Sequence, residues 1–139
     1  MFSLYPEDDH NQTLRIKRFL MALGSYAMWF GLAVFFYLQG MTRVSLTVLL
    51  LSLAGIVVSN GLVFLALRSG FNKRLKDPSL TMTQMVIGTF WIMVVVYYAD
   101  QMRSVFLLVY LVVFVFGLFR LRVRQFLFLS AYAVFHYAV

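Results

Sequence analysis

Cysteine is absent from this chain of 139 residues, and proline occurs only twice. The absence of cysteine excludes disulfides, thiolate metal sites, thiol nucleophiles and cysteine lipidation within these residues. Neither Pro6 nor Pro78 lies inside a long apolar stretch, whereas the broken helices of transporters often contain proline. The sequence also has no His-Glu-x-x-His pair, no glycine-rich phosphate loop and no Gly-x-Ser-x-Gly elbow. No catalytic, metal or cofactor site is therefore expected within residues 1–139.

Charged residues are also scarce, at 12% of the chain, while hydrophobic residues make up 63%. The hydrophobic residues gather in five stretches, at residues 19–38, 44–67, 82–99, 104–119 and 125–139. An α-helix needs about 20 apolar residues to cross a hydrocarbon core of about 30 Å, and the first four stretches approach that length. The sequence predicts an all-α, polytopic transmembrane helical bundle of five spans over residues 19–139, preceded by a cytoplasmic tail at 1–18.

Positive charge is distributed unevenly among the segments that connect these stretches. Because each span reverses the side of the membrane, ten of the twelve Lys and Arg residues share one face. They form three groups, which are Arg15, Lys17 and Arg18, then Arg68, Lys73, Arg74 and Lys76, and finally Arg120, Arg122 and Arg124. The other face receives Arg43 and Arg103. Cytoplasmic loops carry the excess of Lys and Arg, so the N-terminus is predicted to be cytoplasmic.

The fifth stretch is shorter than the others. Residues 125–139 would cover about 22 Å as a helix, which is less than the hydrocarbon thickness. Five spans that start in the cytoplasm would also leave the chain end outside the cell. We therefore expect an incomplete fifth span, and a sixth span beyond residue 139 that returns a longer parent protein to the cytoplasm.

The connecting segments predict how neighbouring spans pair. Residues 39–43 and 100–103 are so short that each must join an antiparallel helical hairpin. The longer connection at 68–80 contains Asp77 before Pro78, which suggests a turn or a first helix cap. Thr81, with a glutamine three residues later, fits a capping box at the start of the third span.

Polar and small residues within the spans predict contacts between helices. Asn60 follows Gly55 and Ser59, a small-x-x-x-small pair that lets a neighbouring backbone approach while the amide bridges helices. A ligand contact at Asn60 is the alternative, because intramembrane polar groups are often functional. Two further patterns predict packing: a second small-x-x-x-small pair, and an aromatic ridge on the fourth span. These are Ala27 with Gly31, and Phe106 with Tyr110 and Phe114.

Five further residues are candidate contacts. His136 lies one helical turn after Tyr132, and a neutral imidazole there could bond a neighbouring helix or sense pH or a ligand in an outward-facing cavity. Asp100 and Arg103, at i and i+3, predict a weak exposed ion pair. Tyr97 beside them fits the aromatic belt or the entrance of an extracytoplasmic pocket.

Two segments resemble the membrane-embedded N-terminal sensory module of bacterial GGDEF diguanylate cyclases. These are residues 76–85, KDPSLTMTQM, and residues 116–124, FGLFRLRVR. The resemblance implies a bacterial inner-membrane protein that senses a signal, dimerises, or does both. It also implies a missing cytoplasmic domain that makes cyclic di-GMP from GTP with Mg²⁺. None of the family's catalytic residues can be assigned here, because Gly-Gly-Asp-Glu-Phe does not occur in the chain.

Other functions and partners remain open. The same bundle would suit the sensor module of a membrane histidine kinase, and a small transporter or scaffolding membrane subunit is a third hypothesis. The expected partners are the lipid bilayer, a second copy of the chain, and a small-molecule or lipid signal. Anionic lipid would contact Arg120, Arg122 and Arg124 at the turn between the fourth and fifth spans. Nucleic acid is not expected, because the basic residues lie in short segments beside helix ends.

Overall fold

The computed structural model describes residues 9–138, apart from eight side chains of the fourth helix, at 109, 110, 113, 114, 116–118 and 120. The described chain is all-helical, with 84% helix and no strand. Its five α-helices are α1 (His10–Leu38), α2 (Leu46–Arg68), α3 (Thr81–Tyr98), α4 (Arg103–Arg120) and α5 (Val123–Ala138). Two 3₁₀ turns, η1 (Phe71–Arg74) and η2 (Asp100–Met102), precede α3 and α4. The predicted all-α class is confirmed.

Three of the described helices, α1, α2 and α3, are long and apolar enough to cross a membrane. Their outward surfaces carry large apolar side chains, such as Leu51, Leu62 and Leu65 on α2, each more than 60% exposed. A soluble monomer rarely exposes so much contiguous apolar surface, whereas lipid tails accommodate it. The chain is therefore a membrane protein. The finer expectation of five spans stays a prediction, since α5 has 16 residues and α4 is described only in part.

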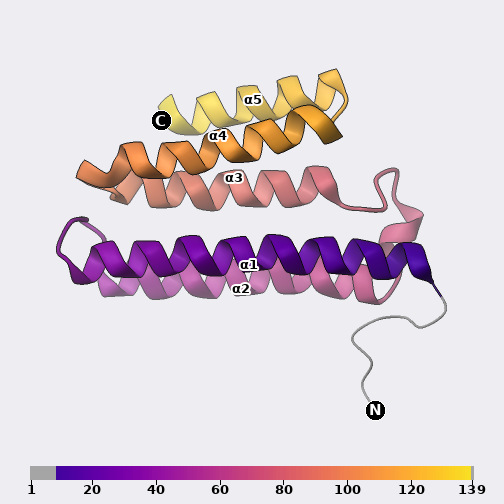
Figure 1. Cartoon of the computed structure of the whole chain (residues 1–139), viewed down its shortest axis with the longest axis horizontal. Helices are drawn as coiled ribbons and strands as arrows, with labels where there is room; N and C mark the ends of the chain where they lie inside the picture. Colours follow the sequence, from indigo (N-terminus) through magenta and orange to yellow (C-terminus); the bar gives the residue numbers. More distant parts are fainter. Residues whose placement is uncertain (1–8, 139) are drawn as a thin grey trace, which may run out of the picture.

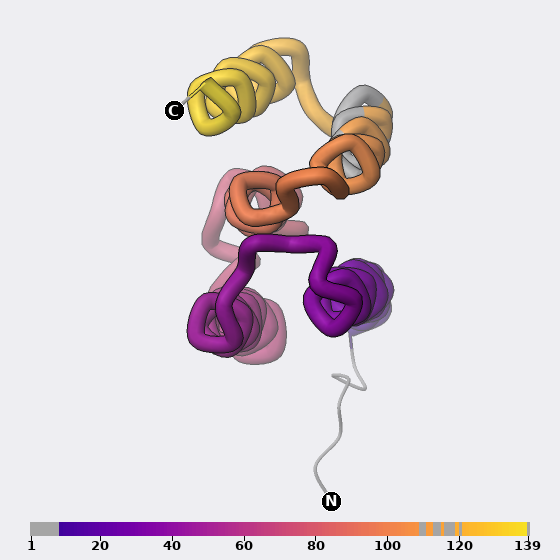
Figure 2. Tube along the Cα trace, turned by 90° about the vertical axis from the view of Figure 1, so that its left-hand side faces the viewer, coloured from indigo at the N-terminus to yellow at the C-terminus, as the bar shows by residue number. Residues whose placement is uncertain are grey.

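The helices run back and forth along one axis, as Figure 1 shows. Helices α1 and α2 lie side by side, and α3 packs against α2, α4 and α5. The end-on view in Figure 2 places α3 between the α1–α2 pair and the α4–α5 pair. Helix α3 thus contacts α2 on one side and both α4 and α5 on the other.

The two ends of the bundle differ in charge. One end, here called the basic end, holds the start of α1, the α2–α3 connection and the α4–α5 turn. The opposite end holds the α1–α2 and α3–α4 connections, with Arg43 and Arg103. The backbone therefore brings the three basic groups together at one end, as the alternation of spans requires.

Each end has its own apolar cluster. Near the basic end, Ile16 and Phe19 of α1 pack with Val63 and Leu67 of α2 and with Leu80. Near the opposite end, a second cluster joins α1, α3 and α4; its buried members are Ala33, Val96, Ala99 and Phe106. Both clusters lie where helices meet, so packing fixes the helix ends on which the polar contacts depend.

Helix α1 begins earlier than the first apolar stretch. Asp9 is its N-cap, and the Asp9 side chain accepts a hydrogen bond of 3.0 Å from the Gln12 N–H. Residues 10–18, placed in a tail by the sequence pattern, are therefore the first turns of a helix of 29 residues. At about 1.5 Å per residue this helix is about 43 Å long, so its first turns extend beyond a core of about 30 Å.

The start of α3 corrects the predicted capping box. Thr81 is already the first helical residue, and the N-cap is Leu80, which has a left-handed φ of 52° and no side-chain cap bond. Asp77 caps the helix instead: its carboxylate accepts from the Ser79 N–H at 3.2 Å and the Met82 N–H at 3.1 Å. The expected turn or cap at Asp77 is confirmed, because Pro78 folds the chain back so that the carboxylate reaches the helix.

The opposite end corrects the predicted Asp100–Arg103 pair. Asp100 bonds Arg43 of the α1–α2 connection at 3.0 Å, while Arg103 donates to the Val96 carbonyl at 3.4 Å. Asp100 has a left-handed φ of 46°, which takes it out of the regular helix in which residues i and i+3 are neighbours. The Arg43 N–H also donates to the Tyr98 carbonyl, so the two connections are joined.

Candidate functional site

The small-x-x-x-small pair on α2 receives a side chain, not a backbone. The Trp91 indole of α3 lies over Gly55, where an added Cβ would be 2.1 Å from the ring. Trp91 Nε1 donates to Ser59 Oγ at 3.1 Å, and that hydroxyl donates to the Gly55 carbonyl at 2.8 Å. The expected close approach of two backbones is therefore wrong, because the indole fills the space that the small residues leave.

Asn60 is buried, with 5% of its surface exposed, and lies where α1, α2 and α3 meet. Its amide donates to the Ile56 carbonyl one turn back at 2.9 Å, and the Tyr26 side chain of α1 lies near it. The Tyr26 hydroxyl lies 3.1 Å from where a Cβ would stand on Gly88 of α3. This hydrogen bond of Asn60 is thus within α2, and the glycine on α3 leaves room for the tyrosine.

His136 packs among rings on α5. Its Nδ1 lies 3.0 Å from the Tyr132 carbonyl of its own helix, and its ring meets that of Phe90 on α3 edge to face at 6.3 Å. The Tyr132 and His136 rings are 4.1 Å apart. The polar contact described for His136 is therefore within α5, and its contact with the neighbouring helix is aromatic.

The other two predicted packing patterns are the Ala27–Gly31 pair and the aromatic ridge on α4. Ala27 and Gly31 are exposed, and among the described residues nothing lies within 4 Å of a Cβ placed on Gly31, so no described helix packs on that glycine. Phe106 is buried and meets Phe36 of α1 edge to face at 5.8 Å. The side chains of Tyr110 and Phe114 lie outside the described residues.

The opposite end contains a small cavity that Tyr97 and Asp100 do not line. Its volume is about 30 Å³, and its lining includes Tyr98 and Thr42, whose buried hydroxyl oxygen has no partner in the described chain. This is space for about one water. Tyr97 is 69% exposed, and Asp100 pairs with Arg43. The structure therefore does not bring Asn60, Tyr97, Asp100, Tyr132 and His136 together in one site.

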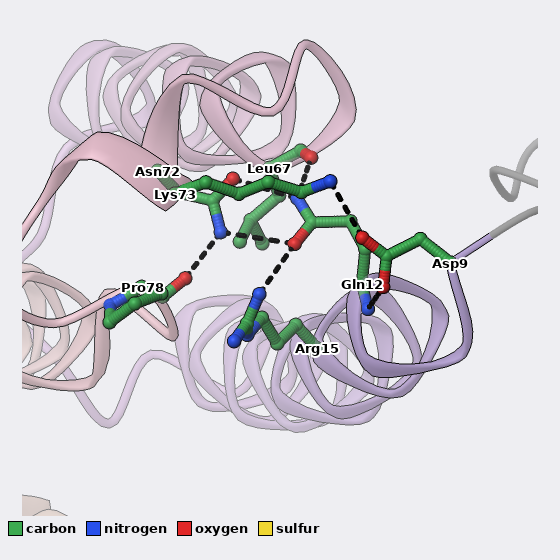
Figure 3. Close-up of polar contacts among 7 residues, drawn as sticks. All are labelled: Asp9, Gln12, Arg15, Leu67, Asn72, Lys73 and Pro78. Carbon is green, nitrogen blue, oxygen red and sulfur yellow. Dashed lines mark hydrogen bonds and ion pairs between the residues drawn. The ribbon is translucent and has the colours of Figure 1, made fainter.

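A buried amide pair at the basic end is the most extensive polar contact described (Figure 3). Gln12 of α1 and Asn72 of η1 are 2% and 0% exposed. Gln12 Nε2 donates to Asn72 Oδ1 at 2.7 Å, and Asn72 Nδ2 donates back to Gln12 Oε1 at 3.2 Å. The remaining amide protons bond the Leu67 and Pro78 carbonyls. All four amide N–H groups are thus used, which lets two polar side chains be buried without unpaired donors.

An ion pair between Lys73 and Asp9 lies beside this amide pair. Lys73 Nζ is 2.6 Å from the Asp9 carboxylate, as Figure 3 shows. The hydrogen bond from Lys73, followed by that from the Gln12 N–H, holds the pKa of Asp9 below its ordinary value of 3.8. Because the charged form is favoured in the folded protein, the pair stabilises the fold above that value. The stabilisation is lost in acid, as the pH falls through the lowered pKa.

A pocket of about 250 Å³ opens beside the ion pair, lined by Asp9, Asn11, Arg15, Lys73 and Pro78. Arg15 Nη1 donates to Gln12 Oε1 at 2.9 Å, so the buried amide orients the guanidinium (Figure 3). Two cations from different elements therefore face one open space. We take this pocket and the Gln12–Asn72 pair beneath it as the candidate site.

The remaining basic candidates lie on the α4–α5 turn. Arg122 and Arg124 are exposed, and the Arg122 N–H donates to Gln125 Oε1 at 3.1 Å at the start of α5. The side chain of Arg120 lies outside the described residues. The exposed pair is free to meet a bilayer surface, but no pocket described here includes it.

The sequence pattern did not single out Gln12, Asn72 or the Asp9–Lys73 pair. The two members of each pair are about 60 residues apart in the sequence, and the local sign of a structured connection is Asp77 before Pro78. Within the described residues, no three His, Asp or Glu side chains gather to hold a metal ion. Comparison of the chain with protein-family models, with curated proteins and with solved structures finds no match.

Proposed function

We propose that the chain is an oriented helical bundle of the bacterial inner membrane, with its N-terminus and basic end in the cytoplasm. The observation that carries this orientation is the gathering of three basic groups at one end of a bundle with an apolar outer surface. Cytoplasmic segments close to membrane spans carry the excess of Lys and Arg. At the opposite end, exposed Tyr97 suits the aromatic belt of the outer interface.

The role we propose for this bundle is that of a sensory and dimerisation module of a signalling protein, with a diguanylate cyclase as the parent. The support is the resemblance of residues 76–85 and 116–124 to such modules. Both segments lie at or next to the basic end, on the side where a cytoplasmic GGDEF domain would act on GTP and Mg²⁺. No residue of this chain takes part in that reaction.

The proposed mechanism is a shift in helix packing. A hydrogen bond joins α2 to α3 through Ser59 and Trp91, and buried Ile16 and Phe19 of α1 pack on α2. The contact of α5 with α3 includes the edge-to-face packing of the Phe90 and His136 rings. Apolar and ring contacts can slide at lower cost than buried hydrogen bonds can break. A signal that moves the α4–α5 pair against the first three helices would change how two attached output domains meet.

Cysteine labelling tests the orientation, because the chain has no cysteine of its own. Single variants Gln39→Cys and Ser69→Cys place one exposed thiol at each end. A membrane-impermeant maleimide should label Gln39→Cys on intact spheroplasts and Ser69→Cys only after permeabilisation. Labelling of Ser69→Cys from outside would overturn the orientation.

The signalling role is tested on the native protein. Its intact mass and C-terminal sequence should reveal a GGDEF domain, and its expression should raise cellular cyclic di-GMP. A phospho-acceptor histidine helix in place of that domain would favour the sensor-kinase alternative. A native mass of 16.1 kDa would remove both readings and leave transport or scaffolding.

A further inference from the structure

The pocket at the basic end has the composition of an anion site. We propose that it binds a phosphate group, carried by an anionic lipid headgroup or free in the cytoplasm. The donors that line it are the Arg15 guanidinium, the Lys73 ammonium and the Asn11 amide, and one carboxylate, Asp9, opposes them. Proteins commonly bind phosphate with the planar guanidinium of Arg and the ammonium of Lys.

Arg15 is positioned for this role by the buried amide pair. Among the described residues, one of its five N–H groups is used, in the bond to Gln12 Oε1 at 2.9 Å. Gln12 is in turn fixed by Asn72, so the guanidinium is oriented before any ligand arrives. Donors that are already oriented lose less conformational entropy on binding.

The surroundings raise the positive potential of the pocket. Lys17 and Arg18 follow on α1, and Arg74 and Lys76 follow Lys73 along the chain; all four are exposed. Charges of one sign around a concave site attract an oppositely charged ligand over distances up to the Debye length. Asp9 therefore competes with a phosphate for Lys73 in a strongly basic setting.

The headgroup arm of this proposal depends on the membrane orientation proposed above. Arg15 lies one helical turn before Phe19, where the apolar stretch of α1 begins. With about 43 Å of helix and about 30 Å of hydrocarbon, the first turns of α1 stand at the level of the lipid phosphates. A phosphate of the cytoplasmic leaflet can reach the pocket from there without leaving the bilayer surface.

The test is native mass spectrometry of the full chain in a neutral detergent, titrated separately with dihexanoyl phosphatidylglycerol, inorganic phosphate and dihexanoyl phosphatidylcholine. Arg15→Gln and Lys73→Gln should each weaken phosphate binding about fivefold. Lys76→Gln is the matched control, because it removes the same charge from the same connection outside the pocket. It should leave the affinity unchanged.

Asp9→Asn separates ligand binding from a structural effect. It breaks the same ion pair as Lys73→Gln while keeping a good N-cap residue, yet it should tighten phosphate binding because the competing carboxylate is gone. Binding of phosphatidylglycerol alone would assign a lipid headgroup, and binding of inorganic phosphate as well would show that the free ion suffices.

Three results would overturn the proposal: equal binding of the zwitterionic lipid, an equal loss in Lys76→Gln, or no binding of either phosphate compound. Because the titration is made in detergent, it measures phosphate binding at the pocket independently of membrane orientation and of signalling. Spheroplast labelling tests the orientation separately, so failure of one proposal can be told from failure of the other.

Discussion

At the scale of single residues, the fold depends on a few polar side chains that find partners far away in the sequence. Gln12 and Asn72 are the clearest pair, because both are buried and each donates to the other. A buried donor that loses its partner costs more than the intact bond contributes, since the group has left water and gained nothing. The pair therefore makes the basic end sensitive to substitution at either position.

Asn72→Leu should lower the free energy of unfolding by about 1–3 kcal/mol, because it leaves the Gln12 amide and the Pro78 carbonyl without their partner. Denaturant unfolding in detergent, followed by circular dichroism, measures the loss. Adding Gln12→Leu should cost less than the sum of the two single changes. Asn11→Leu, at an exposed neighbouring position, serves as the control, and an equal loss there would contradict the prediction.

Gly55→Ala should also destabilise the protein, by about 1–3 kcal/mol, because the added methyl collides with the Trp91 indole. Gly61→Ala on the same helix is the matched control, since nothing lies within 4 Å of its Cβ position. It should be neutral or stabilise the helix by up to about 1 kcal/mol. In a Trp91→Phe background the cost of Gly55→Ala should fall; an unchanged cost would show that the indole is not the obstacle.

At the scale of elements, α3 determines how the bundle is assembled, because it contacts both helix pairs. Its start depends on a turn and not on its own first residue. Asp77 bonds the N–H groups of Ser79 and Met82, and Gln84 Nε2 bonds the Ser79 carbonyl at 2.9 Å. The α2–α3 connection is thus hydrogen-bonded to the first turn of α3.

Asp77→Ala should therefore cost about 1 kcal/mol of stability, as the loss of a helix cap does. Thr81→Ala should change the free energy of unfolding by less than about 0.5 kcal/mol, because Thr81 is inside the helix and makes no cap bond. Denaturant unfolding in detergent measures both. A larger loss of stability for Thr81→Ala than for Asp77→Ala would favour the capping box over the Asp77 turn.

At the scale of the whole molecule, orientation is set by the sum of charges at each end and not by one cluster. Replacing Arg120, Arg122 and Arg124 together by Gln leaves the basic groups of α1 and of the α2–α3 connection in place. The orientation should be retained, with Gln39→Cys still labelled from outside and Ser69→Cys protected. Inversion or a mixed population in this background would show that the α4–α5 turn dominates.

The sequence by itself determined the helices, their approximate bounds and the gathering of basic residues at one end. These follow from local composition: a long apolar stretch forms a helix wherever it is placed in lipid, and successive helices must reverse direction. The tertiary structure alone decided which side chains meet. Asp100 pairs with Arg43 and not Arg103, Trp91 fills the space over Gly55, and Gln12 finds Asn72. Such pairings depend on helix rotation, tilt and loop conformation, which the packing of the whole bundle fixes and no local pattern contains.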